Sequence, residues 1–104
     1  MIVLCMGLGG CHPSTNVDAF RAQVRTWVPV GTSVEAAEAA LEARSFTRTA
    51  MVWEDAQGTI VDLTYGQSAI ILWPLPILRV WTVWLRIEDG QTTSVRAHTG
   101  LIGP

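Results

Sequence analysis

The stretch ILRVWTVWLRIEDGQTTSVRAH, residues 77–98, decides the fold. Asp89-Gly90 near its centre is a strong signal for a two-residue turn between antiparallel strands. The β-branched and aromatic residues before the turn predict a strand over 77–88, and the residues after it predict a strand over 91–98. The rest of the chain is therefore interpreted around this hairpin.

Alternation along the first of these strands separates two sets of side chains. One set is expected beneath the helices and contains Trp81, Val83, Leu85 and Ile87. The other set is expected on an uncovered face and contains Val80, Thr82, Trp84, Arg86 and Glu88. Val80, Trp84 and Arg86 form a half-apolar patch of the composition found at protein interfaces, so we expect them to bind a partner. The alternative is that a loop over 74–76 shields Trp84.

Upstream, residues 46–53 and 59–65 are β-like, and the polar turn 54–58 between them predicts a second hairpin. The run AIILWPLPIL, residues 69–78, is apolar, but its two prolines exclude a regular helix and the middle of a central strand. A membrane span over 69–87 is disfavoured by these prolines and by two arginines, which are costly in hydrocarbon.

Two helices precede the strands. The first has Asn16 as N-cap, ends before Pro29, and presents one apolar face with Val17, Phe20, Val24 and Trp27. The second follows a turn, and Thr32 with Glu35 has the spacing of a capping box. Its inward positions are Val34, Ala37 and Leu41, and its predicted solvated face carries Glu35, Glu38 and Glu42.

This order of elements predicts the α+β class: two N-terminal helices packed on one face of a three- to four-stranded antiparallel meander. Most of the five tryptophans are expected in the core. The predicted core contains Phe20, Val24, Leu41, Trp81, Val83 and Leu85.

Composition excludes several functions. The 104 residues make one domain with a net charge of −2, and its basic residues are all Arg, which argues against nucleic-acid binding and against lysine-dependent enzymes. A zinc site at Cys11 and His12 lacks a fourth ligand even with His98. Spacing does not make Glu54 and Asp62 a catalytic pair, so we predict no catalytic residue, no metal and no cofactor.

The first eleven residues suggest where the protein is located in the cell. Residues 1–10 are uncharged and apolar and end in small residues, which suits a signal segment truncated at its start. Leu8-Gly9-Gly10-Cys11 resembles the lipobox of bacterial lipoproteins, and this resemblance implies a lipid on Cys11. Residues 11–16 are then a short tether and 17–104 the folded domain. The alternative is that the segment is a buried first strand with Cys11 as a core thiol.

The segment VPVGTSVEAAEAALEARSF, residues 28–46, resembles the small outer-membrane-assembly lipoproteins of the SmpA/OmlA (BamE-like) type. Ser45 stands where such proteins often carry Gly. The resemblance implies a location in the bacterial envelope, facing the periplasm and more at the outer than the inner membrane. It transfers no functional residue.

We therefore expect a non-enzymatic, lipid-anchored envelope module that binds or braces an envelope or membrane protein, with a homodimer left open. One alternative is a secreted soluble inhibitor or binding protein of the same fold. Another is a small enzyme.

Overall fold

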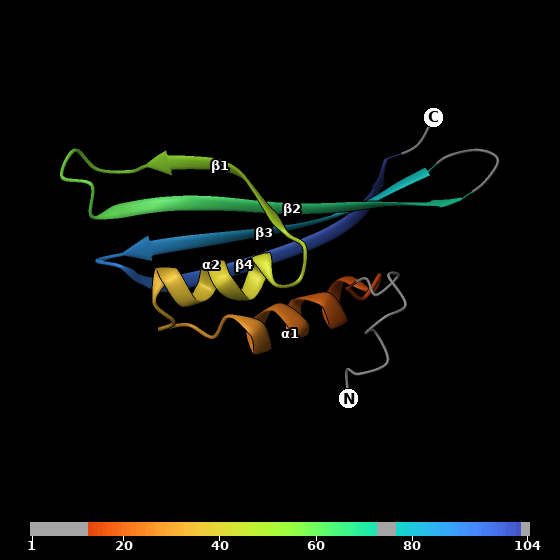
Figure 1. The fold of residues 1–104 in the computed structure, drawn as a ribbon, viewed down its shortest axis with the longest axis horizontal. Helices are drawn as coiled ribbons and strands as arrows, with labels where there is room; N and C mark the ends of the chain where they lie inside the picture. The colour runs from red at the N-terminus through yellow and green to blue at the C-terminus, as the bar shows by residue number, and fades with distance from the viewer. Residues whose placement is uncertain (1–12, 73–76, 103–104) are drawn as a thin grey trace.

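The computed structural model describes residues 13–72 and 77–102, and these form two helices and one sheet (Figure 1). The sheet is antiparallel, with the strands in chain order, so the predicted α+β fold is confirmed with four strands. The elements are α1 (Val17–Trp27), α2 (Val34–Glu42), β1 (Thr47–Trp53), β2 (Ile60–Leu72), β3 (Ile77–Glu88) and β4 (Gln91–Ile102).

The hairpin of β3 and β4 turns as predicted. Glu88 pairs with Gln91, and the two residues between them have positive φ, 52° at Asp89 and 80° at Gly90. Positive φ at both positions is the type I′ geometry, whose twist matches that of the strands. β2 and β4 are longer than predicted, because β2 pairs with β3 as far as Leu72 opposite Ile77, and β4 pairs with β3 as far as Ile102 opposite Leu78.

Helix α1 begins and ends where the sequence predicts. The Asn16 side chain accepts a hydrogen bond from the Ala19 amide at 3.0 Å, and the helix ends at Trp27, ahead of Pro29. Phe20 and Val24 are buried, and the helix lies along β4.

Helix α2 begins one residue later than the capping-box spacing indicated. The N-cap is Ser33, whose hydroxyl accepts from the Ala36 amide at 3.2 Å, and not Thr32. Thr32 exchanges backbone contacts with β4 instead, since the Thr92 amide donates to its carbonyl at 2.8 Å. This pairing holds Thr32 in extended chain and moves the helix start forward.

The way helix α2 ends explains the left-handed backbone conformation of Ser45. The Ser45 amide donates to the Glu42 carbonyl and the Phe46 amide to the Leu41 carbonyl, both at 3.0 Å. This pair of bonds is the Schellman motif, whose central residue is left-handed, and Ser45 has a φ of 68°. Phe46 and Leu41 are both buried, as the hydrophobic contact of that motif requires.

The core lies between the helices and the face of the sheet that they cover, here called the inner face. The six predicted core residues are all buried, as are Val61, Leu63 and Tyr65 of β2. Trp81 is the largest buried side chain among the described residues. The predicted facing of β3 is thus confirmed.

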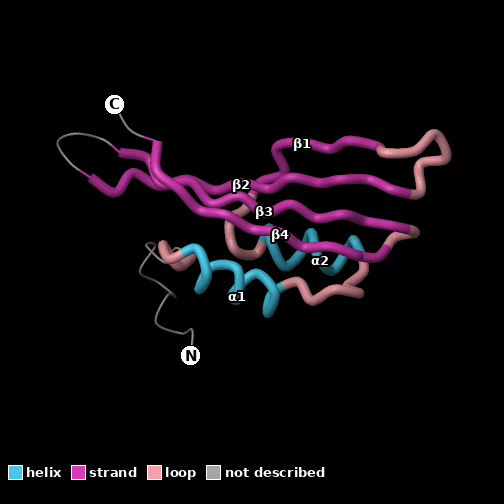
Figure 2. Tube along the Cα trace, turned by 180° about the vertical axis from the view of Figure 1, so that it is seen from behind, coloured by secondary structure: helices cyan, strands magenta, loops and turns pink. Residues whose placement is uncertain are grey.

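Strand β1 lies beside the helix layer and not beneath it (Figures 1 and 2). Every residue of β1 is exposed, including Met51, Val52 and Trp53. The expectation that most tryptophans are core is therefore wrong for the described residues, where only Trp81 is fully buried. Trp27 packs at the core margin against Phe20 and Phe46, with ring centroids 6.4 and 6.2 Å away.

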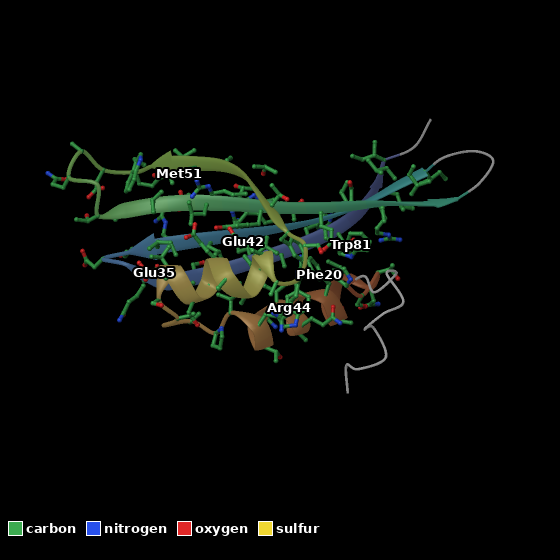
Figure 3. The ribbon with its side chains drawn as sticks, viewed as in Figure 1. Phe20, Glu35, Glu42, Arg44, Met51 and Trp81 are labelled. Atoms are coloured by element: carbon green, nitrogen blue, oxygen red, sulfur yellow. The ribbon has the colours of Figure 1, made fainter. Side chains whose placement is uncertain are left out.

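The predicted solvated face of α2 is right for Glu35 and Glu42, which are exposed on the helix (Figure 3), and wrong for Glu38. The Tyr65 hydroxyl donates to the Glu38 carboxylate at 2.8 Å, and Arg48 lies 3.3 Å from the same oxygen. The pKa of Tyr65 is raised well above its usual range. Burial of the hydroxyl is the larger cause, and its hydrogen bond to the Glu38 carboxylate is the second. Glu38 therefore joins α2 to β1 and β2.

The residues before α1 are bonded to the sheet. The Trp81 indole N–H donates to the Ser14 carbonyl at 2.9 Å, and the Arg79 guanidinium donates to the Thr15 carbonyl at 3.2 Å. The Ser14 amide donates to the Gln23 side chain at 2.8 Å. The described part of the predicted tether is thus packed on the domain. Neither described helix has the length and apolar character needed to cross a bilayer.

Candidate functional site

The sheet face opposite the helices, here called the outer face, carries all three predicted binding residues. Val80, Trp84 and Arg86 alternate with the buried residues of β3 and point away from the helices. Val80 and Trp84 are half-buried and Arg86 is exposed. Residues directly opposite one another on neighbouring strands form rows across this face, and each predicted residue belongs to a different row.

Arg86 is the centre of an ion cluster. Its guanidinium lies 3.1 Å from the carboxylate of Asp62, its partner on β2, and 3.7 Å from that of Glu54. The structure therefore brings Glu54 and Asp62 together, which their spacing did not indicate. Hydrogen bonding to Arg86 lowers the pKa of Asp62, whereas hydrogen bonding to Asp62 and its charge raise the pKa of Glu54.

Both carboxylates lie at the surface, and both contact the same guanidinium. The cluster fixes the orientation of the Arg86 guanidinium on the outer face.

Trp84 forms the next row with Arg96. The Arg96 guanidinium carbon lies 5.6 Å from the centroid of the indole, which is cation–π geometry, and Thr64 flanks Trp84 on β2. Trp84 and Arg86 border a depression of about 490 Å³ that is also lined by Asp62, Leu85, Ser94 and Arg96. An aromatic ring framed by two oriented guanidinium groups is thus the centre of the outer face.

Val80 lies apart from this centre. Its neighbours in the row are Ser68 and Gly100, and the row of Thr82 and His98 separates it from Trp84. The predicted patch is therefore a strip along β3 and not a compact cluster.

Sequence reasoning missed Arg96. A regular two-residue hairpin would place Val95 opposite Trp84, but the register shifts by one residue after Thr92. The Thr93 hydroxyl donates to the Arg86 carbonyl at 3.3 Å and to the Glu88 carboxylate at 3.1 Å at this β-bulge. Because of the bulge, Arg96 lies on the outer face with Trp84.

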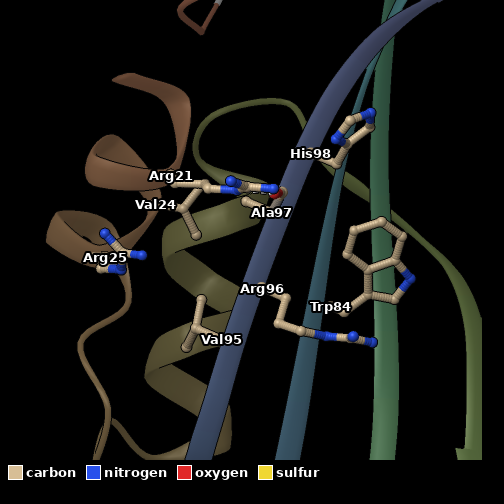
Figure 4. A pocket seen from close by; sticks show the side chains of 8 residues that line it. All are labelled: Arg21, Val24, Arg25, Trp84, Val95, Arg96, Ala97 and His98. Carbon is tan, nitrogen blue, oxygen red and sulfur yellow. Dashed lines mark hydrogen bonds between the residues drawn. The ribbon is translucent and has the colours of Figure 1, made fainter. Parts of the chain in front are cut away.

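A second depression, of about 560 Å³, runs along the free edge of β4 (Figure 4). It is lined by three arginines and His98, but these side chains do not converge. Arg21 donates to the Ala97 carbonyl at 3.0 Å and lies with Arg25 on the helix side of β4. Arg96 and His98 lie with Trp84 on the other side of the strand. The arrangement covers an edge strand and does not form an anion site.

Two predicted features remain outside the described residues. Cys11, the proposed lipidation site, precedes them, and so does His12, its neighbour in the zinc alternative. His98, the third residue of that alternative, is exposed on β4. In residues 13–72 and 77–102, no three His, Cys, Asp or Glu side chains gather in a way that would hold a metal ion.

No family model, no curated protein and no solved structure matches this chain.

Proposed function

We propose that this protein is a non-enzymatic, lipid-anchored module of the bacterial envelope that binds an envelope or membrane protein through the outer face of its sheet. The lipid is proposed on Cys11, and the contact residues are Val80, Trp84 and Arg86, with Arg96 added. The observation that carries the proposal is Trp84, a half-buried aromatic on the outer face, which has Arg96 at cation–π distance and borders one depression with Arg86, whose guanidinium is held by Asp62.

The chemistry of this face favours a protein partner. Tryptophan and arginine are the side chains most enriched at the energetic centres of protein interfaces. The ion cluster holds Arg86, and the indole holds Arg96, so both arginines lose little conformational entropy on binding. Antiparallel sheet faces can pack face to face against a second protein layer.

The N-terminal segment is bonded to the inner face of β3, the strand whose outer face carries the proposed contact residues. Pro13 follows Cys11 by two residues in sequence, and Ser14 and Thr15 are bonded to Trp81 and Arg79 of β3. A lipid on Cys11 would therefore hold the domain close to the bilayer and keep the effective concentration of a membrane partner high.

An in-cell crosslinking scan tests the binding surface. Photoreactive residues at Val80, Thr82 and Trp84 are expected to give adducts with a partner, and Glu35 and Glu42 on the outside of α2 are the comparison positions. Adducts confined to the helix positions, or at no position, contradict the proposal.

A matched pair of variants sharpens this test. With the photoreactive residue at Thr82, Trp84→Ala is expected to remove the adducts, whereas Trp53→Ala, which truncates an exposed tryptophan on β1, is expected to keep them. Equal adducts in the two variants would show that Trp84 is not part of the binding surface.

A further inference from the structure

The sheet projects past the helices at the end where β2 leads into β3 (Figures 1 and 2). Ile70, Leu78 and Ile102 form a row across β2, β3 and β4 on the outer face, and Leu101 lies on the inner face beside Arg79. The exposed fractions are 67% for Ile70, 56% for Leu101 and 58% for Ile102. Ile70, Leu78, Leu101 and Ile102 are here called the sheet tip.

Charge is distributed unevenly along the sheet. The acidic residues of the strands and their turns, Glu54, Asp55, Asp62, Glu88 and Asp89, all lie at the end away from the sheet tip. No Asp or Glu occurs in 63–72, in 77–87 or in 91–102, where the strands run toward the tip. The nearest acidic residue in the helices is Asp18, in the first turn of α1 beside Arg21. An apolar end without carboxylates is suited to contact with a bilayer, since carboxylates are costly there.

The first described residues are bonded to β3 near this same end. Arg79, which is bonded to the Thr15 carbonyl, pairs with Ala69 and Leu101. The row of Ile70, Leu78 and Ile102 follows one residue further, at about 3.4 Å along the strand. Thr15 and Ser14 are therefore bonded to β3 within three residues of the sheet tip, at Arg79 and Trp81.

We infer that the sheet tip inserts its aliphatic side chains into the interfacial region of a phospholipid bilayer. The inference rests on the proposed location at a membrane and adds a second contact to the proposed lipid anchor. Insertion stays shallow, because strand edges carry backbone groups that hydrocarbon cannot satisfy.

A lipid surface fits the tip better than a protein does. A stable protein interface needs about 800 Å² from each partner and is centred on Trp, Tyr or Arg, whereas the tip offers a few aliphatic side chains at one extremity of the molecule. A bilayer needs no complementary shape, so a few exposed Ile and Leu side chains suffice for reversible contact.

Vesicle binding tests the inference without the proposed lipid. The full chain carrying Cys5→Ser and Cys11→Ser is mixed with phosphatidylcholine vesicles, and the partition coefficient is measured by co-sedimentation. Ile70→Ser is expected to weaken partitioning by about tenfold, as loss of one buried aliphatic side chain implies. Val30→Ser, which makes the same change at an equally exposed residue of the α1–α2 turn, is expected to leave it unchanged. Equal partitioning of the two variants overturns the inference.

A depth measurement gives the orientation. A fluorophore on Leu101→Cys in the same background is expected to be quenched by brominated phosphatidylcholine severalfold more than a fluorophore on Val30→Cys. Both proteins carry residues 1–10, so a difference reports the position of the label on the domain. Equal quenching of the fluorophore by the brominated lipid at both positions overturns the inference. The crosslinking scan at Val80, Thr82 and Trp84 judges the proposed function independently of either result.

Discussion

At the scale of single residues, two positions depart from the usual behaviour of their residue types, Ser45 in its backbone conformation and Asp62 in its pKa. Ser45 is left-handed, with a φ of 68°, which costs a non-glycine residue roughly 1–2 kcal/mol. Asp62 accepts hydrogen bonds from Arg86 at 3.1 and 3.5 Å, which keep it ionised at unusually low pH. Each makes a prediction that one substitution tests.

Ser45→Gly is expected to stabilise the protein by about 0.5–1 kcal/mol, because glycine adopts the left-handed conformation without steric cost but loses more entropy on folding. The free energy of unfolding from a urea titration measures the change. Ser45→Ala is the control, and it is expected to give no gain. A gain of the same size from both substitutions would show that the hydroxyl, and not the backbone, causes the strain.

Arg86→Gln is expected to raise the pKa of Asp62 toward or above its usual value, because the guanidinium that favours the ionised form is lost and Glu54 remains nearby. Carboxyl carbon chemical shifts followed by NMR during an acid titration measure this pKa. Arg96→Gln removes a more distant cation and is expected to move the same pKa less.

The hydrogen bonds between Arg86 and Asp62 also make the free energy of unfolding depend on pH. Since folding lowers the pKa of Asp62, its contribution is present above the unfolded pKa and is lost as the pH falls through the folded value. The unfolding free energy of Arg86→Gln should accordingly fall less on acidification than that of the parent. An equal fall in both proteins contradicts the ion cluster as a source of stability.

At the scale of elements, the bulge at Thr93 sets which face of β4 carries which residues. One extra residue in β4 turns Arg96 outward to Trp84, while Ala97 and Thr99 turn into the protein. In a strand whose side chains alternate, a slip of one residue exchanges the two faces.

Deletion of Thr93 removes only the unpaired residue, so Arg96 is expected to stay opposite Trp84 in a regular hairpin, and the cost should be no more than about 1–2 kcal/mol for the lost hydrogen bonds. Thr93→Ala keeps the bulge, loses two hydrogen bonds at the surface and is expected to cost about 1 kcal/mol or less. Denaturant unfolding compares the two variants. A loss of several kcal/mol in the deletion variant alone would show that the bulge itself, and not only the Thr93 hydroxyl, stabilises the hairpin.

The bulge also marks where prediction from sequence ends. Alternation and the Asp89-Gly90 turn are local signals, so the facing of β3 and the core around Trp81 followed from them. The partner of Trp84 could not be predicted in this way, because no local sequence signal shows that Thr93 is unpaired. Val80, Trp84 and Arg86 were placed on the correct face, whereas Arg96 and the link from Arg86 to Glu54 needed the register.

At the scale of the whole molecule, the helix pair is displaced toward β4. Arg21 of α1 reaches the Ala97 carbonyl at the free edge of β4, and β1 on the opposite side is left exposed. Periodicity shows which side of a helix faces a sheet but not which strands it covers. For this reason the sequence predicted the layers, while the exposure of Met51 and Trp53 was not foreseen.

The proposed anchor makes a prediction at this scale. Protein made in a bacterial host, from a gene extended upstream to a complete signal segment, is expected to carry an acylated Cys11 as its first residue. Mass spectrometry of the purified protein detects the acyl chains, and Cys11→Ala is expected to lack them. An intact, unmodified N-terminus in the unsubstituted protein contradicts the lipidation.

The bonds from β3 to Ser14 and Thr15 have a mechanical consequence. Trp81, which holds Ser14, and Trp84, at the centre of the outer face, belong to the same strand, about 10 Å apart along it. Tension between the N-terminus and a partner on the outer face would run along β3 without crossing either helix. β3 is paired on both sides, so its neighbours would share this load as shear across many hydrogen bonds. Trp81→Phe, which removes the indole N–H, should then let the first residues detach at a lower pulling force while the sheet stays intact.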